Sequence, residues 1–141
     1  MINDGLKLTG KLKIALNGET VQEVDNLVVT DGKEYVASRM KDATATAMSH
    51  MAIGSGSTAA AASDSALGNQ LGRVALTSTA VSGAVVTYTA TFGAGTGTGA
   101  VTEAGILNAS SSGDLLCRTV FSVVNKGASD SMTITWTVTV S

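Results

Sequence analysis

The 141-residue sequence predicts an all-β fold with antiparallel strands arranged as a sandwich or barrel, together with one short helix. Three observations lead to this prediction. The last segment alternates apolar and polar residues with a period of two. Several further apolar segments of strand length are separated by Gly, Ser and Asn, and only one segment shows helical spacing.

The C-terminal segment 132–140, MTITWTVTV, carries five apolar residues at even positions and four threonines at odd positions. Successive side chains of a strand point to opposite faces, so this period gives the strand one apolar face. We expect the threonines to line a wetter or partner-facing side. One buried face is typical of an antiparallel sheet. The residues expected to face the core are Met132, Ile134, Trp136, Val138 and Val140.

A β-hairpin is predicted near the N-terminus. Asn17-Gly18, a dipeptide typical of two-residue hairpin turns, separates an alternating segment from a returning strand over residues 19–24. Strict pairing across this turn would set Leu12 opposite Glu23, so we expect a bulge or an edge position there. A single domain should span residues 1–141, with residues 1–29 as an N-terminal arm or an edge hairpin.

The short helix is predicted over residues 30–41, a length of about three turns. Thr30 or Asp31 can cap its first turn. Because the helix is too short to build a helical domain, it should lie across one edge or end of the sheet. One helical face carries Tyr35, Val36, Arg39 and Met40.

The remaining sequence predicts further strands, for a total of seven or eight. A small-residue loop over residues 54–64 should lead into one helical turn at 64–68, with Leu67 and Leu71 as anchors. A strand is then expected to begin at Val74 and continue to residue 79. Later strands are expected over residues 84–92, 101–107 and 115–124.

The composition favours a protein that lives in an assembly. Charged residues make up 14% of the chain, against about 25% in a typical soluble domain, and the polarity comes from 19 Thr and 15 Ser. A surface with so little charge is poorly protected against association. The net charge is −2 and the nine Lys and Arg are scattered, so nucleic acid is not an expected partner. Neither a secretory signal nor a membrane span is recognised.

The sequence predicts no catalytic, cofactor-binding or metal site. Gly95 to Ala100 fits the dinucleotide fingerprint nominally, but the segment after it resembles a strand and not the required helix. His50 is the only histidine and has no companion at a metal-ligand spacing. The single cysteine, Cys117, lies in an apolar segment, where we expect a buried, inert thiol.

The carboxylates were weighed as candidates for calcium binding and for sugar hydrolysis. Asp64, Asp114 and Asp130 fall in predicted loops, where they more commonly accept hydrogen bonds from turn backbone than bind calcium. A glycosidase pair can meet in space from distant positions, but five aromatic residues leave few platforms for a sugar. The sequon at Asn108 has no weight without a secretory signal.

Three segments carry a resemblance to a known group of proteins. Residues 51–73 (MAIGSGSTAAAASDSALGNQLGR), 100–108 (AVTEAGILN) and 123–130 (VVNKGASD) resemble small virion proteins of tailed bacteriophages. Members of this group are similar to capsid cement, or decoration, proteins. The resemblance therefore implies a jelly-roll-like antiparallel β-sandwich that sits outside the head and clamps adjacent major capsid subunits.

We therefore expect a non-enzymatic cement protein, made in the bacterial host cytoplasm and located on the capsid exterior. Its expected partners are the major capsid protein and itself, as a homodimer or homotrimer, without cofactor, nucleic acid or membrane. One alternative is a tail or fibre component that binds the host, and a second is a small carbohydrate-active enzyme. The N-terminal segment could add a strand to a neighbour's sheet, and the partner contacts expected there are Leu6, Leu8, Leu12 and Ile14.

Overall fold

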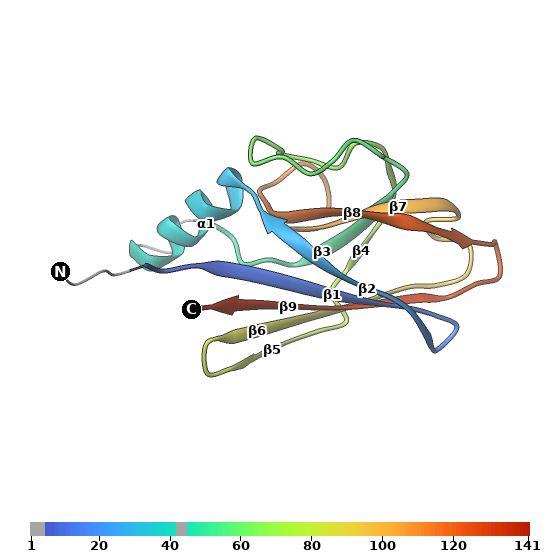
Figure 1. Cartoon of the computed structure of the whole chain (residues 1–141), viewed down its shortest axis with the longest axis horizontal. Coiled ribbons are helices and arrows are strands. Elements are labelled where there is room, and N and C mark those ends of the chain that lie inside the picture. The colour runs from blue at the N-terminus through green and yellow to red at the C-terminus, as the bar shows by residue number, and fades with distance from the viewer. Residues whose placement is uncertain (1–4, 42–44) are drawn as a thin grey trace.

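A computed structural model describes residues 5–41 and 45–141 of the chain (Figure 1). The one helix in these residues is α1 (Thr30–Lys41). The strands are β1 (Leu8–Leu16), β2 (Glu19–Val28), β3 (His50–Gly54), β4 (Gln70–Ala75), β5 (Ser78–Ser82), β6 (Val85–Phe92), β7 (Gly99–Leu107), β8 (Leu115–Lys126) and β9 (Met132–Val140).

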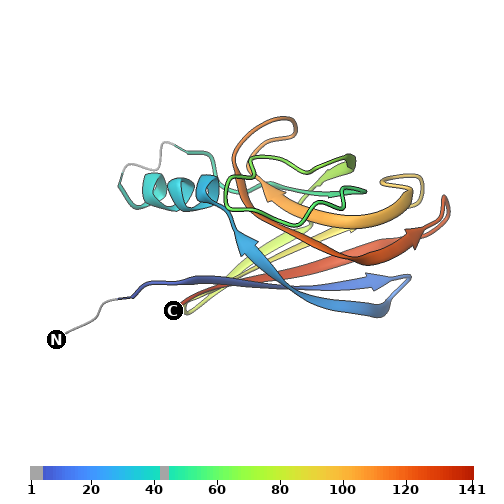
Figure 2. The same cartoon turned by 45° about the horizontal axis from the view of Figure 1, so that its top comes forward.

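These strands form one antiparallel sheet in the order β4-β3-β7-β8-β2-β1-β9-β6-β5. The sheet curls into a half-barrel, as Figures 1 and 2 show from two directions, and β4 comes into contact with β6. The predicted all-β antiparallel class with one short helix is confirmed. Division into the two stacked sheets of a jelly-roll sandwich is not confirmed.

The core lies inside the curl, and β9 contributes four buried side chains to it. β9 pairs with β1 on one side and with β6 on the other, so that Trp136 lies between Leu12 and Tyr88. The predicted strand and its apolar face are confirmed: Met132, Ile134, Trp136 and Val138 are buried, and only Val140 is half-buried. In the described residues no helix is long and apolar enough to cross a membrane.

The predicted hairpin is present, but its place in the sheet differs from the prediction. Asn17 and Gly18 both have positive φ, 51° and 83°, as a two-residue hairpin turn requires. The expected bulge is confirmed, because the β1–β2 register shifts between Ile14 and Ala15. However, β1 lies between β2 and β9, and β2 lies between β1 and β8. The arm or edge hairpin expected for residues 1–29 is therefore wrong for residues 8–28, which form the middle of the sheet.

The helix has the predicted bounds, and it lies across one end of the half-barrel, as expected (Figure 2). Two predictions further along the chain are wrong. The residues from Asp64 to Gly68 form an irregular segment with bends instead of one helical turn. The strand expected to run from Val74 to residue 79 is broken at Leu76 and Thr77, so that β4 and β5 are separate strands.

The outer face of β3, β7 and β8 is covered by the loop of residues 55–69, which appears in green above these strands in Figure 1. Leu67 from this loop packs on a second, smaller apolar cluster. Beside Leu67, Glu103 of β7 and Arg118 of β8 lie fully buried beneath the loop. The cluster consists of Val29, Ala52, Leu107 and Leu115.

Glu103 fastens this loop to the sheet. Its carboxylate accepts hydrogen bonds from the backbone N–H groups of Gly56, Gly68 and Asn69 at 2.6–2.7 Å. Arg118 Nε donates to Glu103 Oε1 at 3.0 Å, and Arg118 Nη1 pairs with Asp64 Oδ2 of the loop at 2.9 Å. Burial alone would raise the pKa of Glu103, but these backbone donors and the guanidinium outweigh burial and hold the pKa below its ordinary value of 4.5.

Replacing Glu103 by Gln should lower the free energy of unfolding by about 3 kcal/mol, because it leaves the buried Arg118 guanidinium without its charged partner. Denaturant unfolding measures this loss. Glu23→Gln, at an exposed position of β2, is the matched control and should change stability by less than about 0.5 kcal/mol. Equal losses for the two variants would contradict the anchoring role of Glu103.

The same contact predicts an acid dependence. A carboxylate whose pKa is lowered in the folded state stabilises the protein fully above its ordinary pKa of 4.5, and this contribution is lost as the pH falls through the folded value. Wild-type stability should therefore fall more steeply below pH 4.5 than that of Glu103→Gln, measured as denaturant midpoints across a pH series. Parallel curves for the two proteins would show that Glu103 does not make this contribution.

Candidate functional site

The helix is held against one end of the half-barrel by contacts with β8. Asp31 accepts a hydrogen bond from the backbone N–H of Leu115 at 2.7 Å, and Gly32 lies so close to Leu116 that an added Cβ would overlap the Leu116 carbonyl. On the next turn Tyr35 and Val36 pack against the main core. These contacts fix α1 at a set distance from the sheet.

The strands next to α1 diverge at the same end. β1 pairs with β9 from Leu8 onward, whereas its pairing with β2 starts only at Gly10 opposite Asn26. Beyond this point β2 leaves β1 and pairs with β8 at Leu27 and Val28. Leu8 therefore has a strand neighbour on one side only.

The backbone groups of Leu8 face the open side. Lys7 and Ser141 exchange two backbone hydrogen bonds, at 2.7 and 2.9 Å, so odd-numbered residues of this segment direct their N–H and C=O groups to β9. By the alternation of an antiparallel ladder, Leu8 directs its own groups to the side that β2 has left. An extended chain segment could pair with them there.

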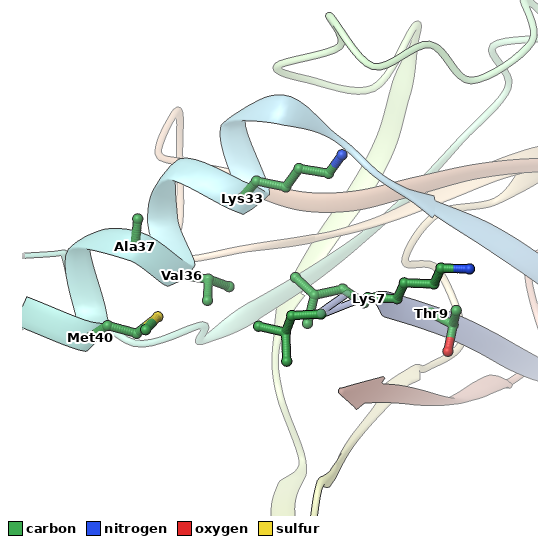
Figure 3. Close-up of a pocket in the computed structure, with 8 residues that line it drawn as sticks. Lys7, Thr9, Lys33, Val36, Ala37 and Met40 are labelled. Atoms are coloured by element: carbon green, nitrogen blue, oxygen red, sulfur yellow. The ribbon is translucent and has the colours of Figure 1, made fainter. Parts of the chain in front are cut away.

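A groove lies between this open edge and the helix, and we call it the α1 groove. It has a volume of about 460 Å³, and Figure 3 shows Val36 and Met40 projecting into it from α1 toward the start of β1. Leu6 and Met40 are 72% and 76% exposed, which is unusual for large apolar side chains. The lining residues are Leu6, Lys7, Leu8, Thr9, Lys33, Val36, Ala37 and Met40.

The groove continues into a smaller apolar cavity of about 300 Å³ at the end of the core. The two share Leu8, Val36 and Met40, and the cavity extends inward to Tyr88 and Leu116. Burial, followed by the nearby Tyr35 and Cys117, raises the pKa of Tyr88 to about 12. The Tyr88 hydroxyl is therefore neutral at physiological pH, and it offers a hydrogen-bonding group without charge.

The charges at the groove are positive. Lys7 and Lys33 extend toward the same end of it in Figure 3, and neither has an ion-pair partner in the part of the chain that the structure describes. A neighbouring hollow of about 450 Å³ shares Leu8, Thr9 and Lys33 and reaches Asp25 and Asn26. Both amide atoms of Asn26 are buried without a hydrogen-bond partner among the described residues. The apolar lining and the two lysines of the α1 groove itself suit an extended segment with apolar side chains and a carboxylate.

The four predicted partner contacts separate into two pairs. Leu6 and Leu8 line the α1 groove, where contact with a partner stays a prediction. Leu12 and Ile14 are fully buried in the core, because the even-numbered residues of β1 beyond Gly10 face the inside of the half-barrel. As partner contacts these two are wrong, since they could reach another molecule only if the sheet opened.

The other candidate residues lie in ordinary structural positions. His50 begins β3, and its Nδ1 lies 2.7 Å from Ser49 Oγ, so the ring makes a local hydrogen bond. Cys117 is fully buried, so the predicted burial is confirmed, and burial raises the pKa of its thiol, as suits the inert thiol that we expect. The run of glycines before β7 leads directly into that strand at Gly99, and Gly93 accepts a hydrogen bond from the buried Lys126.

The side chains of the loop aspartates accept hydrogen bonds within the turns in which they lie. Asp64 accepts from the backbone N–H of Ala61, and Asp130 accepts from that of Gly127 and from the side chain of Asn17. Asp114 accepts from Asn108, whose side chain is thereby tied into the same turn. The expected role as acceptors in turns is confirmed for Asp64 and Asp130.

The helical spacing predicts the face of α1 that carries Val36 and Met40, but not the groove that this face forms. The missing information was the position of the helix, because Lys33 and Lys7 become neighbours only when α1 packs beside the start of β1. No protein-family model matches the chain, and no curated protein or solved structure matches it.

The wall of the groove can be tested through Gly32. Gly→Ala in an exposed helix usually stabilises by about 1 kcal/mol, but here the added methyl would overlap the backbone of Leu116 and push α1 off β8. Gly32→Ala should therefore lower the free energy of unfolding by about 1–3 kcal/mol. Glu34→Ala, on the exposed side of α1, is the control and should change stability by less than about 0.5 kcal/mol. A stabilised Gly32→Ala variant would contradict the close packing of α1.

Proposed function

We propose that the chain is a structural, non-enzymatic virion protein of a tailed bacteriophage, a cement protein that binds the outside of the capsid and strengthens contacts between major capsid subunits. The α1 groove is the observation that carries the proposal on the structural side. Within the part of the chain that the structure describes, it combines exposed apolar side chains, an unpaired strand edge and lysines without an ion-pair partner in one place. An extended segment of the major capsid protein is the proposed occupant.

Sequence composition supports a role in an assembly. The chain has 14% charged residues, and the outward-facing positions of β9 and β6 are largely Thr. Surfaces of this kind can be covered by neighbours without leaving buried charges unpaired. The resemblance of residues 51–73, 100–108 and 123–130 to phage virion proteins supports the capsid as the place of assembly.

The jelly-roll description of the fold belongs to the same proposal. It is supported by the contact between β4 and β6, which brings the two arms of the curled sheet toward each other around a shared core. α1, which forms one wall of the groove, lies at the end of the half-barrel opposite the turn between β1 and β2 (Figure 2). A shell protein with this arrangement presents one end of its sheet to the capsid.

The stabilising effect would follow from binding equilibrium. A protein that binds the closed lattice better than separated subunits shifts the equilibrium toward the lattice by mass action. Each copy contributes little, but many identical contacts act on one shell. Neither a covalent bond nor a catalytic group is needed for this effect.

Binding of the purified protein to phage heads that lack it tests the proposal. Wild-type protein should co-sediment with the heads and raise their resistance to heat. Leu6→Gln and Met40→Gln should each weaken binding by about tenfold, because each removes a large apolar side chain from the contact. Val123→Gln, at an exposed apolar position of β8 outside the groove, is the matched control and should bind like wild type.

Two results would contradict the proposal. Binding to tails or to host cells without binding to heads would assign the protein to the tail or fibre instead. Head binding that Val123→Gln weakens as much as Leu6→Gln and Met40→Gln would move the contact away from the α1 groove.

A further inference from the structure

β5 forms one edge of the nine-stranded sheet, and it is the lowest strand in Figure 1. All five of its residues are exposed, and Val81 is 73% exposed. β6 pairs with one side of β5, whereas no strand in residues 5–41 and 45–141 pairs with the other side. This edge lies on a different element from the α1 groove.

The edge carries none of the usual protection against pairing. Natural edge strands are commonly shielded by charged side chains or proline. Residues 78–82 read STAVS, without a charge, and the whole chain lacks proline. The opposite edge, β4, carries Arg73, whose guanidinium donates to the backbone carbonyls of Ala109 and Ser112. β5 is therefore the less protected of the two edges against pairing with another strand.

The hydrogen-bonding direction of each β5 residue follows from the ladder. Val140 donates its backbone N–H to Ala84 O, so even-numbered residues of β6 direct their backbone groups to β9 and odd-numbered residues direct theirs to β5. Thr87 is odd-numbered and pairs with Ala80, so Ala80 uses its backbone groups within the sheet. Its neighbours Thr79 and Val81 then direct their N–H and C=O groups to the open edge.

From this geometry we infer that β5 pairs antiparallel with β5 of a second copy, about a two-fold axis at Ala80. Thr79 of each copy then lies opposite Val81 of the other, and the two residues exchange both backbone hydrogen bonds, four in all by symmetry. Ser78 lies opposite Ser82, so β-branched residues face each other and no like charges meet. The strand is self-complementary in this register, and the second copy is its partner.

This pairing is separate from binding to a capsid, and it can be tested with the isolated protein alone. Analytical ultracentrifugation over a range of concentrations should show a reversible monomer–dimer equilibrium. Ala80→Lys should raise the dissociation constant by about tenfold or more, because the axis places the two lysines directly opposite each other. Ala80→Glu should do the same, and an equimolar mixture of the two variants should recover association. Val123→Lys, away from the edge, should leave the constant unchanged.

A disulfide test fixes the register. Ala80→Cys should cross-link two copies under mild oxidation, because residues opposite each other at a non-hydrogen-bonded position have Cα atoms about 4.5 Å apart, within disulfide range. Ser82→Cys should not, since the two Cys residues would be four strand positions apart, roughly 13 Å. The native Cys117 is fully buried and does not compete.

A monomer at every concentration would overturn the inference. A dimer that persists in Ala80→Lys or Ala80→Glu would do so too. So would cross-linking of Ser82→Cys without cross-linking of Ala80→Cys. Each of these results leaves head binding by the α1 groove untouched. Conversely, failure to bind heads would leave the pairing of β5 as measured.

Discussion

The sheet has to bury its apolar face against itself, and the rest of the structure follows from this constraint. Trp136 lies at the centre of the buried face, with Leu12 on one side and Tyr88 on the other, and strands from both arms of the curl close over it. A sheet that curls in this way into a half-barrel leaves two edges and an open end. The surfaces that we propose for partners are the places where this closure stops: β1 separates from β2 beside α1, and β5 ends the sheet.

The loop on the outer face of the sheet is held by a different type of interaction. Beneath the loop of residues 55–69, Glu103 and Arg118 satisfy each other and three backbone N–H groups. A buried ion pair costs desolvation, and it is tolerated when each charge has further hydrogen bonds. The loop of residues 55–69 is rich in small residues, so it has few large side chains to bury. The ion pair and its hydrogen bonds therefore hold the loop on the sheet in place of apolar packing. The single apolar anchor, Leu67, acts alongside them.

Local patterns predicted the elements of this fold better than their arrangement. The alternation in MTITWTVTV, the Asn17-Gly18 turn and the helix over 30–41 each depend on neighbours in sequence, and all three agree with the structure. The central position of β1 depends instead on pairing with β9 at the far end of the chain. For the same reason the prediction of partner contacts at Leu12 and Ile14 is wrong, because the residues that cover them come from distant strands of the same chain. The pairing of Glu103 with Arg118 carried no sequence signal, because neither residue stands in a recognisable motif.

Two weak contacts on one molecule act differently from either contact alone. Pairing through five residues of β5 buries little surface, and a groove filled by a short segment is also a small contact. If two copies bind neighbouring positions on one shell, the second contact becomes intramolecular, and its effective concentration is set by the spacing of the positions. The pairing at β5 would then be nearly complete on an assembled lattice, whereas free molecules would form dimers reversibly and only as their concentration rises. Such a protein would be largely monomeric when dilute, and a lattice would join its copies by raising their effective concentration.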